Sequence, residues 1–526
     1  IDAARQAIYD LPRVKKFEKK YNQEKIDKYI QSIEAELEEL DYNDPKDKRK
    51  IVSREQKISN IKAGIFTTKK EQELIRPINL GSSVDLPALM YSEEGFHFEV
   101  IKNNESGKPS TDEETLTNLR LTVKKPDSPK AIFLDRLLEL RGLEKMYKTY
   151  IEGWNEKVQD DDRLHGRFLI HGTTSGRLSS AEPNAQQIPK TSVDPNIKLQ
   201  LKAPKGTLYI ASDFSQAELR IMAHLSGDET YLNAFNSGQD PHLAIAATKY
   251  HIPYEEALKI YEDENHPEHK IWKVRRKQAK QIAFGLIYGI GAKLLAVKLS
   301  DPKSGIIVTP EEAQKEMDIF FGQHPKLKTF LKKQEKFLRK NGHLVSLFGR
   351  KRRLPQIYSN DKGEEAYALR LALNFPCQSA ASDMCLFGSI LIYYLMRQGK
   401  LPSTKSVCLV HDANYQITKP ENINIWSIYE MWQIYRNPLT KPYFGFQIDD
   451  VTMDMEFVIG RSMAEELPFI PGYDYKKMLE PDFSVEEYME EHKKYKHIPI
   501  SEYKKRFNKQ MKQYEKDFER THGMES

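Results

Sequence analysis

Two aspartates lie where strand-like segments end, and their positions suit metal-dependent chemistry. Asp213 follows the apolar run 208–211, and Asp412 lies at the turn between the apolar run 407–410 and the segment 413–417. Two carboxylates from different strand ends are what a two-metal site requires, in which paired Mg²⁺ ions about 3.5–4 Å apart stabilise the attacking and leaving oxygens of an in-line displacement. The pair is more informative than either residue, because Asp also favours turns.

A stripe of two cations and two aromatic rings occupies a third segment. Arg276, Lys280, Phe284 and Tyr288 recur every four residues, so on a helix they share one slowly drifting face. Cations can hold a triphosphate, and rings can stack on sugar and base. The alternative interpretation is a solvated basic turn followed by core aromatics.

Glu218 lies five residues after Asp213 and has two interpretations. The spacing Ser215-x-x-Glu218 matches a capping box at the start of a helix. In the other interpretation, Glu218 takes part in the site that Asp213 forms.

Helices and strands must position these residues. Apolar residues at spacings of three and four predict helices over 23–40 and 133–151, so about the first 160 residues are expected to form an elongated helical subdomain. From Arg167 onward, strand-like runs at 207–211 and 407–410 alternate with long helical segments. Residues 407–417 are expected to form a strand, a tight turn with His411 and Asp412 at its tip, and a second strand.

Composition excludes several classes of protein. The 526 residues include 81 Lys plus Arg against 76 Asp plus Glu, and the net charge of +5 permits a polyanionic partner without requiring one. The length predicts three or four structural units. No stretch approaches the roughly 18 apolar residues of a membrane span, and the first residues lack the features of a signal peptide. Three cysteines without a C-x-x-C pair fit a reducing compartment.

Several ordered motifs resemble those of family A DNA polymerases. SDFSQAELR (212–220), RRKQAKQIAFGLIYG (275–289) and LVHDA (409–413) resemble the three polymerase motifs of that family, in order. The resemblance extends to TSGRLSSAEPNAQQIP (174–189), SLFGRKRRLP (346–355) and NFPCQSAASD (374–383). SGKPSTDEETL (106–116) and ELRGLEKMYKTYI (139–151) are similar to the family's thumb. In all, the resemblance covers about residues 79–460.

This resemblance implies an α+β, right-hand polymerase fold with an antiparallel-sheet palm, helical fingers and a helical thumb. The implied domains are an N-terminal helical region and thumb (1–165), palm (166–225 and 365–470), fingers (226–364) and a charged helical C-terminal tail (471–526). The implied activity is template-directed DNA synthesis, in which dNTPs are added to a primer 3′-hydroxyl and pyrophosphate is released.

The resemblance also implies roles for single residues. Asp213 and Asp412 are the catalytic, metal-bridging carboxylates, the backbone carbonyl of Phe214 is a further metal ligand, and Lys280 donates a proton to pyrophosphate. The residues implied to bind the dNTP are Gln216, Glu218, His242, Arg276, Lys280, Phe284 and Tyr288. Those implied to bind primer-template are Arg177, Asn184, Gln186, Asn374, Gln378 and His411. Of these, Arg177 and Gln378 would read the minor groove at the primer terminus.

The implied cofactors and partners follow from this family. They are two Mg²⁺ ions, with Mn²⁺ as a substitute, primer-template DNA and dNTPs, with no membrane partner. No D-x-E occurs in residues 1–100, so no 3′→5′ exonuclease domain is recognisable there, and a separate exonuclease or processivity partner is open. Asp454-Met455-Glu456 instead matches the family's last palm strand. The expected location is the cytoplasm, or the host cytoplasm for a phage-like enzyme.

Departures from the family pattern leave two rival hypotheses. Ala413 stands where the family usually has Glu, Phe214 replaces the usual Tyr, and Ser175 the usual Thr. Ala413 is the one reason to consider a catalytically impaired, polymerase-like DNA-binding protein. The other rival is a single-subunit RNA polymerase, but such enzymes lack a bulky Glu at the position of Glu218 and have Met at that of Phe284.

The C-terminal tail carries an aromatic stripe that the polymerase motifs do not explain. Its members fall at spacings of three and four, with lysines around them: Tyr503, Phe507, Met511, Tyr514 and Phe518. The favoured interpretation is a helix that packs this stripe on the protein body. The alternative is a helix that binds DNA or a partner.

Overall fold

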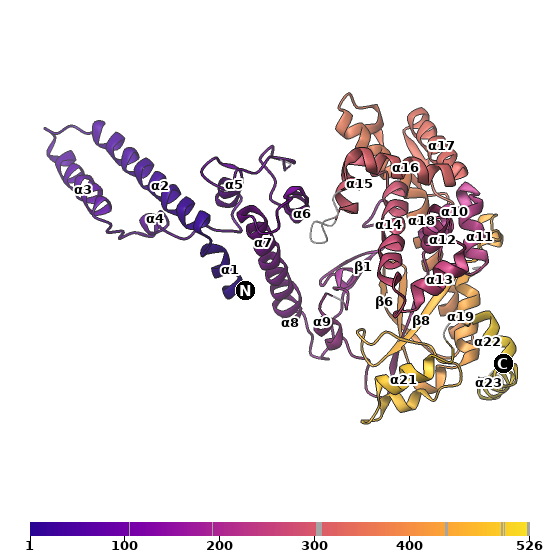
Figure 1. Cartoon of the computed structure of the whole chain (residues 1–526). Coiled ribbons are helices and arrows are strands. Elements are labelled where there is room, and N and C mark those ends of the chain that lie inside the picture. Colours follow the sequence, from indigo (N-terminus) through magenta and orange to yellow (C-terminus); the bar gives the residue numbers. More distant parts are fainter. Residues whose placement is uncertain are drawn as a thin grey trace. The chain divides into compact units, whose positions relative to one another are not determined.

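A computed structural model describes residues 1–104, 106–191, 193–300, 308–436, 440–495, 498 and 500–522. The chain divides into two compact units (Figure 1). Unit 1 contains Ile1–Glu152 with Ser300–Val308, and unit 2 contains Gly153–Leu299 and Thr309–Ser526. The division at residue 152 falls inside the region expected to hold the thumb.

Unit 1 is built from helices. They are α1 (Asp2–Tyr9), α2 (Pro12–Glu38), α3 (Pro45–Lys62), α4 (Lys69–Gln72), α5 (Asp85–Tyr91), α6 (Glu113–Thr122) and α7 (Pro129–Lys145), which continues as a π-helix over Met146–Glu152. The predicted helices over 23–40 and 133–151 are confirmed by α2 and α7. Helix α2 begins earlier than predicted, with Pro12 in its first turn, where the missing N–H needs no partner.

Two hydrophobic clusters stabilise unit 1. The larger one packs α1, α5, α6 and α7 around residues such as Leu89, Phe96 and Phe133. A separate cluster around Ile30, Ile33 and Ile61 holds α2 against α3, and Figure 1 shows these two helices as a hairpin. The α2–α3 hairpin therefore has a small core of its own.

Unit 2 contains a five-stranded antiparallel sheet, which confirms the α+β prediction. The strands are β3 (Leu208–Phe214), β6 (Lys405–Val410), β7 (Ala413–Thr418), β8 (Met455–Gly460) and β9 (Leu467–Pro468), in the order β6-β7-β3-β8-β9. Strand β3 is therefore central, with β7 on one side and β8 on the other. The predicted strand, turn and strand over 407–417 are confirmed by β6 and β7.

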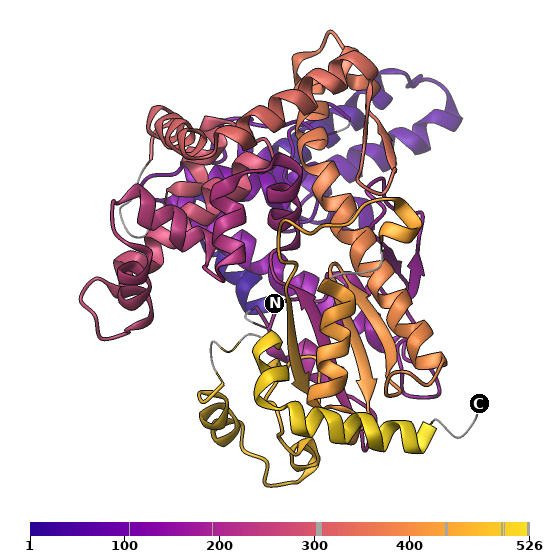
Figure 2. The same ribbon diagram turned by 90° about the vertical axis from the view of Figure 1, so that its right-hand side faces the viewer.

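The two faces of this sheet have different neighbours. Helices α18 (Lys362–Arg397) and α19 (Ile425–Arg436) pack together on one face, where Phe214 meets the Tyr435 ring edge-on at 5.7 Å. Figure 2 shows the long orange α18 beside the strands. Because successive strand residues point to opposite faces, Asp213 lies on the other face, with Tyr209 and Ala211.

The remaining helices of unit 2 lie between the strands in sequence. They include α10 (Ala217–Ser226), α11 (Glu229–Asn236), α12 (Pro241–Lys249), α13 (Tyr254–Glu262), α14 (His269–Ile287), α15 (Ala292–Leu299), α16 (Pro310–Gln323) and α17 (Pro325–Asn341). Shorter elements are α8 (Gly153–Asn155), α9 (Pro195–Gln200) and α20 (Lys441–Phe444), with the hairpins β1 (Arg167–Leu169) and β2 (Ser179–Ala181), and β4 (His343–Val345) and β5 (Lys351–Arg353).

Helix α18 qualifies the expectation that no segment is long and apolar enough to span a membrane. Among the described residues, this one helix passes such a test of length and composition. It also packs against α10, α17, α19 and β7, as a core helix of unit 2 does. Its composition is therefore weak evidence for a membrane.

The C-terminal tail forms α21 (Val485–His492), α22 (Ile500–Arg506) and α23 (Asn508–His522). Tyr503 and Met511 are buried, and the Phe518 ring lies 4.7 Å from that of Trp426 on α19. Figure 2 shows the yellow terminal helices beside the lower end of the sheet. The prediction that the aromatic stripe packs on the protein body is confirmed, although the stripe spans two helices.

Candidate active site

A row of three residues crosses the middle of the sheet. Asp213 on β3 is paired directly with Ala413 on β7 and with Glu456 on β8. Directly paired residues on antiparallel strands point to the same face. Asp412 lies in the turn that precedes Ala413, next to His411, whose φ of 55° is in the left-handed region. The structure therefore brings both predicted carboxylates to one end of β3 and adds Glu456 beside them.

The environment of Asp213 favours its protonated form. Burial by surrounding atoms, the charge of Asp412 and the charge of Glu456 together raise the pKa of Asp213 to about 6. Its side chain nevertheless retains access to a cavity. Negative charge is thus concentrated where a cation could reach it.

The donor set fits a divalent cation held by few protein ligands. Among the described residues, no three His, Cys, Asp or Glu side chains are grouped closely enough to bind a metal. Mg²⁺, however, usually retains several waters and takes one or two carboxylates together with substrate phosphates. Asp213 and Asp412, with their mutual repulsion, suit that mode of binding.

A cavity of about 650 Å³ opens over these carboxylates. Nine of the predicted site residues line it: Gln186, Asp213, Phe214, Gln216, Glu218, Phe284, Tyr288, His411 and Asp412. The volume lies within the range of small-molecule sites. Lys190, Lys198 and Glu466 also line the cavity, and the Lys198 ammonium lies 2.7 Å from the Glu466 carboxylate. The sequence analysis missed these three residues because they lie outside the recognised motif cores.

Glu218 does not cap its helix. The N-cap of α10 is Gln216, in the left-handed region with φ 58°, and no side chain caps the helix there. The Glu218 carboxylate instead accepts a hydrogen bond from Arg177 at 2.7 Å and another from the Tyr288 hydroxyl. The capping-box interpretation is therefore wrong: both acceptor oxygens are engaged by residues distant in sequence.

The cationic stripe lies on α14 as predicted, and Tyr288 lies just past its last residue. The Phe284 and Tyr288 rings stack with centroids 6.0 Å apart, and the Lys280 ammonium lies 5.8 Å from the Phe284 ring. Lys280 is exposed. The Arg276 guanidinium is bound by Asp240 at 2.6 Å, a partner that the sequence analysis did not identify.

The structure buries His242, which the resemblance assigns to the triphosphate. Its side chain is 1% exposed, and neither ring nitrogen has a hydrogen-bond partner among the described residues. Burial lowers the pKa of His242 to about 4, so the ring is neutral at pH 7. His242 packs against Phe284, with ring centroids 5.7 Å apart, but it does not line the cavity.

A second cavity, of about 410 Å³, shares Tyr288 with the first. It is lined by the predicted Asn374 and Gln378 of α18. Its other polar lining residues include Arg352, Tyr367 and Arg370, which the sequence analysis left without a role. Two arginines and two amides in one cavity can donate hydrogen bonds to phosphates and base edges.

Of the other predicted DNA contacts, Gln186 and His411 line the first cavity, and Asn184 and Arg177 do not. Gln186 donates to the Leu409 carbonyl at 3.1 Å, and Asn184 accepts from the Gln186 backbone N–H at 3.0 Å. Asn184 therefore caps the short 3₁₀-helix Ala185–Gln187, a local structural role. His411 is exposed at the tip of its turn.

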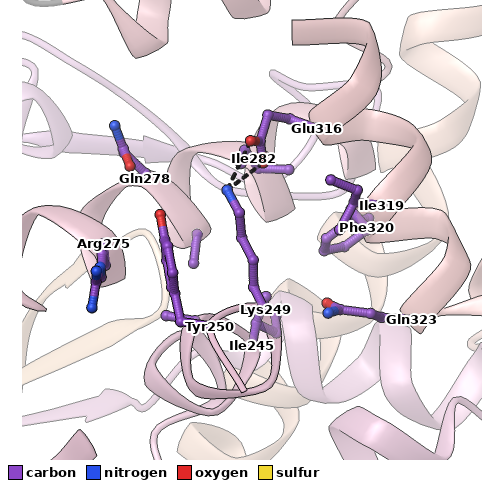
Figure 3. A pocket seen from close by; sticks show the side chains of 12 residues that line it. Ile245, Lys249, Tyr250, Arg275, Gln278, Ile282, Glu316, Ile319, Phe320 and Gln323 are labelled. Carbon is purple, nitrogen blue, oxygen red and sulfur yellow. Dashed lines mark hydrogen bonds and ion pairs between the residues drawn. The ribbon is translucent and has the colours of Figure 1, made fainter. Parts of the chain in front are cut away.

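A small pocket of about 20 Å³ lies between α12, α14 and α16 (Figure 3). Contacts between residues around this pocket hold α14 in place. Figure 3 shows Lys249 reaching Glu316, an ion pair of 2.7 Å, and the Arg275 guanidinium lies 3.9 Å from the Tyr250 ring. Arg276 and Lys280 do not line this pocket. The pocket therefore lies outside the candidate site, and the contacts around it anchor the helix that carries the stripe.

Comparisons with known proteins agree on one family. The sequence model of DNA polymerase family A matches residues 48–425. The thermostable DNA polymerase I of Thermus aquaticus is 32% identical over 60% of this chain and 35% of its own length, and DNA polymerase I of Pseudomonas aeruginosa is 32% identical over 64% and 33%. The chain thus spans about a third of the length of these curated relatives.

A solved structure is similar as well. The POL domain of Pol1 from M. smegmatis, in complex with DNA primer-template and dNTP, has a TM-score of 0.59 and 28% sequence identity. The similarity covers 74% of this chain and 62% of that one.

Proposed function

Because this chain belongs to DNA polymerase family A, we propose that it is a template-directed DNA polymerase that adds dNTPs to a primer 3′-hydroxyl and releases pyrophosphate. One observation carries the proposal. Asp213 on β3 and Asp412 in the β6–β7 turn line one cavity together with Glu218, Phe284 and Tyr288. Carboxylates at one wall and stacked rings at another suit a nucleotide whose phosphates must reach metal-bound oxygens.

We propose that Asp213, Asp412 and the backbone carbonyl of Phe214 hold two Mg²⁺ ions, with Mn²⁺ as a substitute. When bound, such ions stabilise the charge that develops on phosphate oxygens during the displacement. The protein's contribution is to hold two carboxylates close together despite their repulsion, as the raised pKa of Asp213 indicates.

Arg276 and Lys280 are proposed to bind the triphosphate. Both lie on α14, and Lys280 is exposed and free to donate a proton to the leaving pyrophosphate. Arg276 must share its guanidinium between Asp240 and phosphate. Gln216 lines the cavity and has a buried side-chain oxygen without a partner among the described residues. His242 is proposed to act indirectly, by packing against the Phe284 ring and holding it in place.

Primer-template DNA is the proposed partner, and the second cavity is its proposed binding surface. Asn374 and Gln378 would meet the base edges, and Arg352 and Arg370 the phosphates. Arg177 and Gln378 are proposed to test the minor groove at the primer terminus, and His411 to support its terminal phosphate. A separate exonuclease or processivity partner is also proposed, and the proposed place of action is the cytoplasm.

Primer extension tests the proposal. A labelled primer-template with dNTPs should be extended in Mg²⁺ and not in EDTA. Asp213→Ala and Asp412→Ala should abolish extension while duplex binding persists, because binding rests on Lys and Arg contacts with phosphates. Asp482→Ala, at an exposed site, is the matched control. If both active-site variants retained more than about a hundredth of the wild-type rate, the two-metal assignment would be wrong.

Sugar choice separates this proposal from an RNA polymerase. Glu218 lines the nucleotide cavity and accepts a hydrogen bond from the Tyr288 hydroxyl, so a 2′-hydroxyl there would meet an acceptor already engaged. A poorly paired buried polar group costs roughly 1–3 kcal/mol. Glu218→Ala should therefore admit ribonucleotides far more readily, as measured by kcat/KM for dNTP against rNTP. An unchanged ratio would remove Glu218 from sugar selection.

A further inference from the structure

Arg177 connects two groups of the candidate site. Its Nη2 donates to Glu218 Oε1 at 2.7 Å and lies 3.4 Å from Asp412 Oδ1. The three side chains are only 23%, 12% and 19% exposed, so water screens the contacts incompletely. In this arrangement, Arg177 is a counter-cation of Asp412.

These contacts conflict with the proposed tasks of both partners. Asp412 is proposed to hold a divalent cation, and Arg177 is proposed to read the primer terminus. A cation that binds Asp412 while Arg177 stays in place must approach a like charge, which disfavours binding. Removal of the guanidinium from Asp412 would relieve that repulsion.

The geometry indicates that the Arg177 side chain can leave while its backbone stays. The Arg177 carbonyl accepts from the Thr173 hydroxyl at 2.7 Å, and the Gly176 carbonyl accepts from the Ser382 hydroxyl at 3.4 Å. The loop backbone is thus tightly held. Yet the buried Nε of Arg177 has no hydrogen-bond partner among the described residues, so the present position satisfies the guanidinium incompletely.

We propose that Arg177 occupies the metal site's carboxylate until a primer terminus draws the guanidinium away, so that DNA raises the affinity of the carboxylate pair for divalent cations. The inference rests on the proposed function for the DNA step. Binding linkage makes the coupling reciprocal: a bound cation should also tighten the hold on the primer terminus.

Mn²⁺ binding, measured by electron paramagnetic resonance on the full chain without nucleotide, tests the proposal. Arg177→Gln should bind Mn²⁺ at least about fivefold more tightly than wild type in the absence of DNA, the lower end of typical couplings between sites. A primer-template should tighten Mn²⁺ binding by wild type and have little further effect on Arg177→Gln. Arg177→Lys, which keeps the charge, should resemble wild type.

Four controls isolate the contact between Arg177 and Asp412. Arg339→Gln removes an arginine whose ion pairs are with Glu335 and Glu365, and it should leave Mn²⁺ affinity unchanged. The double variant Arg177→Gln with Glu218→Gln should keep the tighter Mn²⁺ binding. That result would exclude Glu218, freed from Arg177, as the new Mn²⁺ ligand. The double variant Arg177→Gln with Asp412→Asn should lose the tighter Mn²⁺ binding. A primer-template with a free 3′ end should tighten Mn²⁺ binding more than a covalently closed dumbbell duplex of equal length, which has no 3′ end.

The DNA-free comparison decides the inference independently of catalysis. Equal or weaker Mn²⁺ binding by Arg177→Gln, or equal tightening by Arg177→Lys, would overturn the counter-cation role even if the chain is an active polymerase. Conversely, a tighter Arg177→Gln in a chain that fails primer extension would support that role and reject the proposed function. Wild-type Mn²⁺ affinity that is indifferent to the primer terminus would overturn the coupling to DNA.

Discussion

Asp213 is held in a setting that opposes its charge, and this should be measurable as stability. Its folded pKa of about 6 lies above that of an unfolded Asp, so the folded state binds the extra proton between about pH 4 and pH 6. The ionised side chain is therefore destabilising, fully so above pH 6. Asp213→Asn should raise the thermal midpoint at pH 8, and the gain should shrink towards pH 4.

Thermal unfolding of wild type and Asp213→Asn across pH 4–8 provides the measurement. Asp482→Asn, at an exposed position, is the control and should show no such trend. A variant that is less stable than wild type at pH 8 would contradict the account of Asp213.

The charge of Glu456 should affect the pH at which the incorporation rate falls on the acid side of the pH profile. It is paired with Asp213 across β3 and β8, and its charge helps to raise the pKa of Asp213. Glu456→Gln should therefore shift the fall in incorporation rate to lower pH at fixed Mg²⁺. Single-nucleotide incorporation between pH 5 and pH 8 measures the shift, with Glu487→Gln as an exposed control. A profile that does not move would mean that Asp213 does not govern this limb.

Residue partners were the least predictable part of the site. Spacing placed Asp213 and Asp412 at strand ends and Arg276 on a helix, and the structure agrees. The spacing of residues gave no sign that Glu218 contacts Arg177 and Tyr288, because those residues lie 41 and 70 positions away in the sequence. Local capping rules compete poorly with charged partners that only tertiary structure brings close.

The junction of α11, α16 and α17 is fixed by a buried pair. The Asp228 carboxylate caps α11 and lies 2.9 Å from His324 Nδ1, and both side chains are almost fully buried. The His324 ring lies between Tyr231 and Phe320, with centroids 4.6 and 4.5 Å away. This pair joins helices that are nearly a hundred residues apart.

Asp228→Ala should destabilise the protein by about 1–3 kcal/mol, because the buried His324 ring nitrogen is left without its hydrogen-bond partner. Burial raises the pKa of Asp228, but its interactions, first among them the hydrogen bond with His324, together lower it by more than burial raises it. The pKa of Asp228 is therefore below its ordinary value. The contribution is thus present above about pH 4 and is lost as pH falls through the lowered pKa. Thermal unfolding at pH 3–8 measures it. Asp361→Ala, an exposed cap of α18, should cost only about 1 kcal/mol.

The tail should act through packing. Met511 is 2% exposed, so Met511→Ala should cost about 2–5 kcal/mol, whereas Lys512→Ala should stay within about 0.5 kcal/mol. Neither should alter single-nucleotide incorporation, because no described tail residue lines either cavity. Thermal unfolding and incorporation assays measure the two effects. A Met511→Ala protein of wild-type stability would reject the packing account.

Periodicity predicted elements better than their ends. The β6–β7 hairpin was predicted from apolar runs and turn residues, and helix α14 from the recurrence of Arg276, Lys280, Phe284 and Tyr288 every four residues. The predicted helix over 133–151 instead changes to a π-helix at Met146. Side-chain periods of three and four cannot distinguish an α-helical turn from a slightly wider one, so this change left no mark in the pattern.

For the whole molecule, class and architecture followed from the order of elements and motifs, and the antiparallel sheet and helical N-terminal unit agree with it. The burial of His242 and the sharing of Tyr288 between two cavities were not predictable. Both depend on how helices pack across the chain, which one sequence does not encode in its local spacing.

The central position of β3 sets the order in which the sheet can form. Both strands that flank it come from much later in the chain, and β8 begins at Met455. At a ribosomal rate of about 5–20 residues per second, β3 waits roughly 12–50 s for its second neighbour. During this interval the intervening helices can form, but the edge of β3 and its aspartate have no lasting partner. Newly made chains are therefore exposed to misfolding and to chaperones while β3 is unpaired.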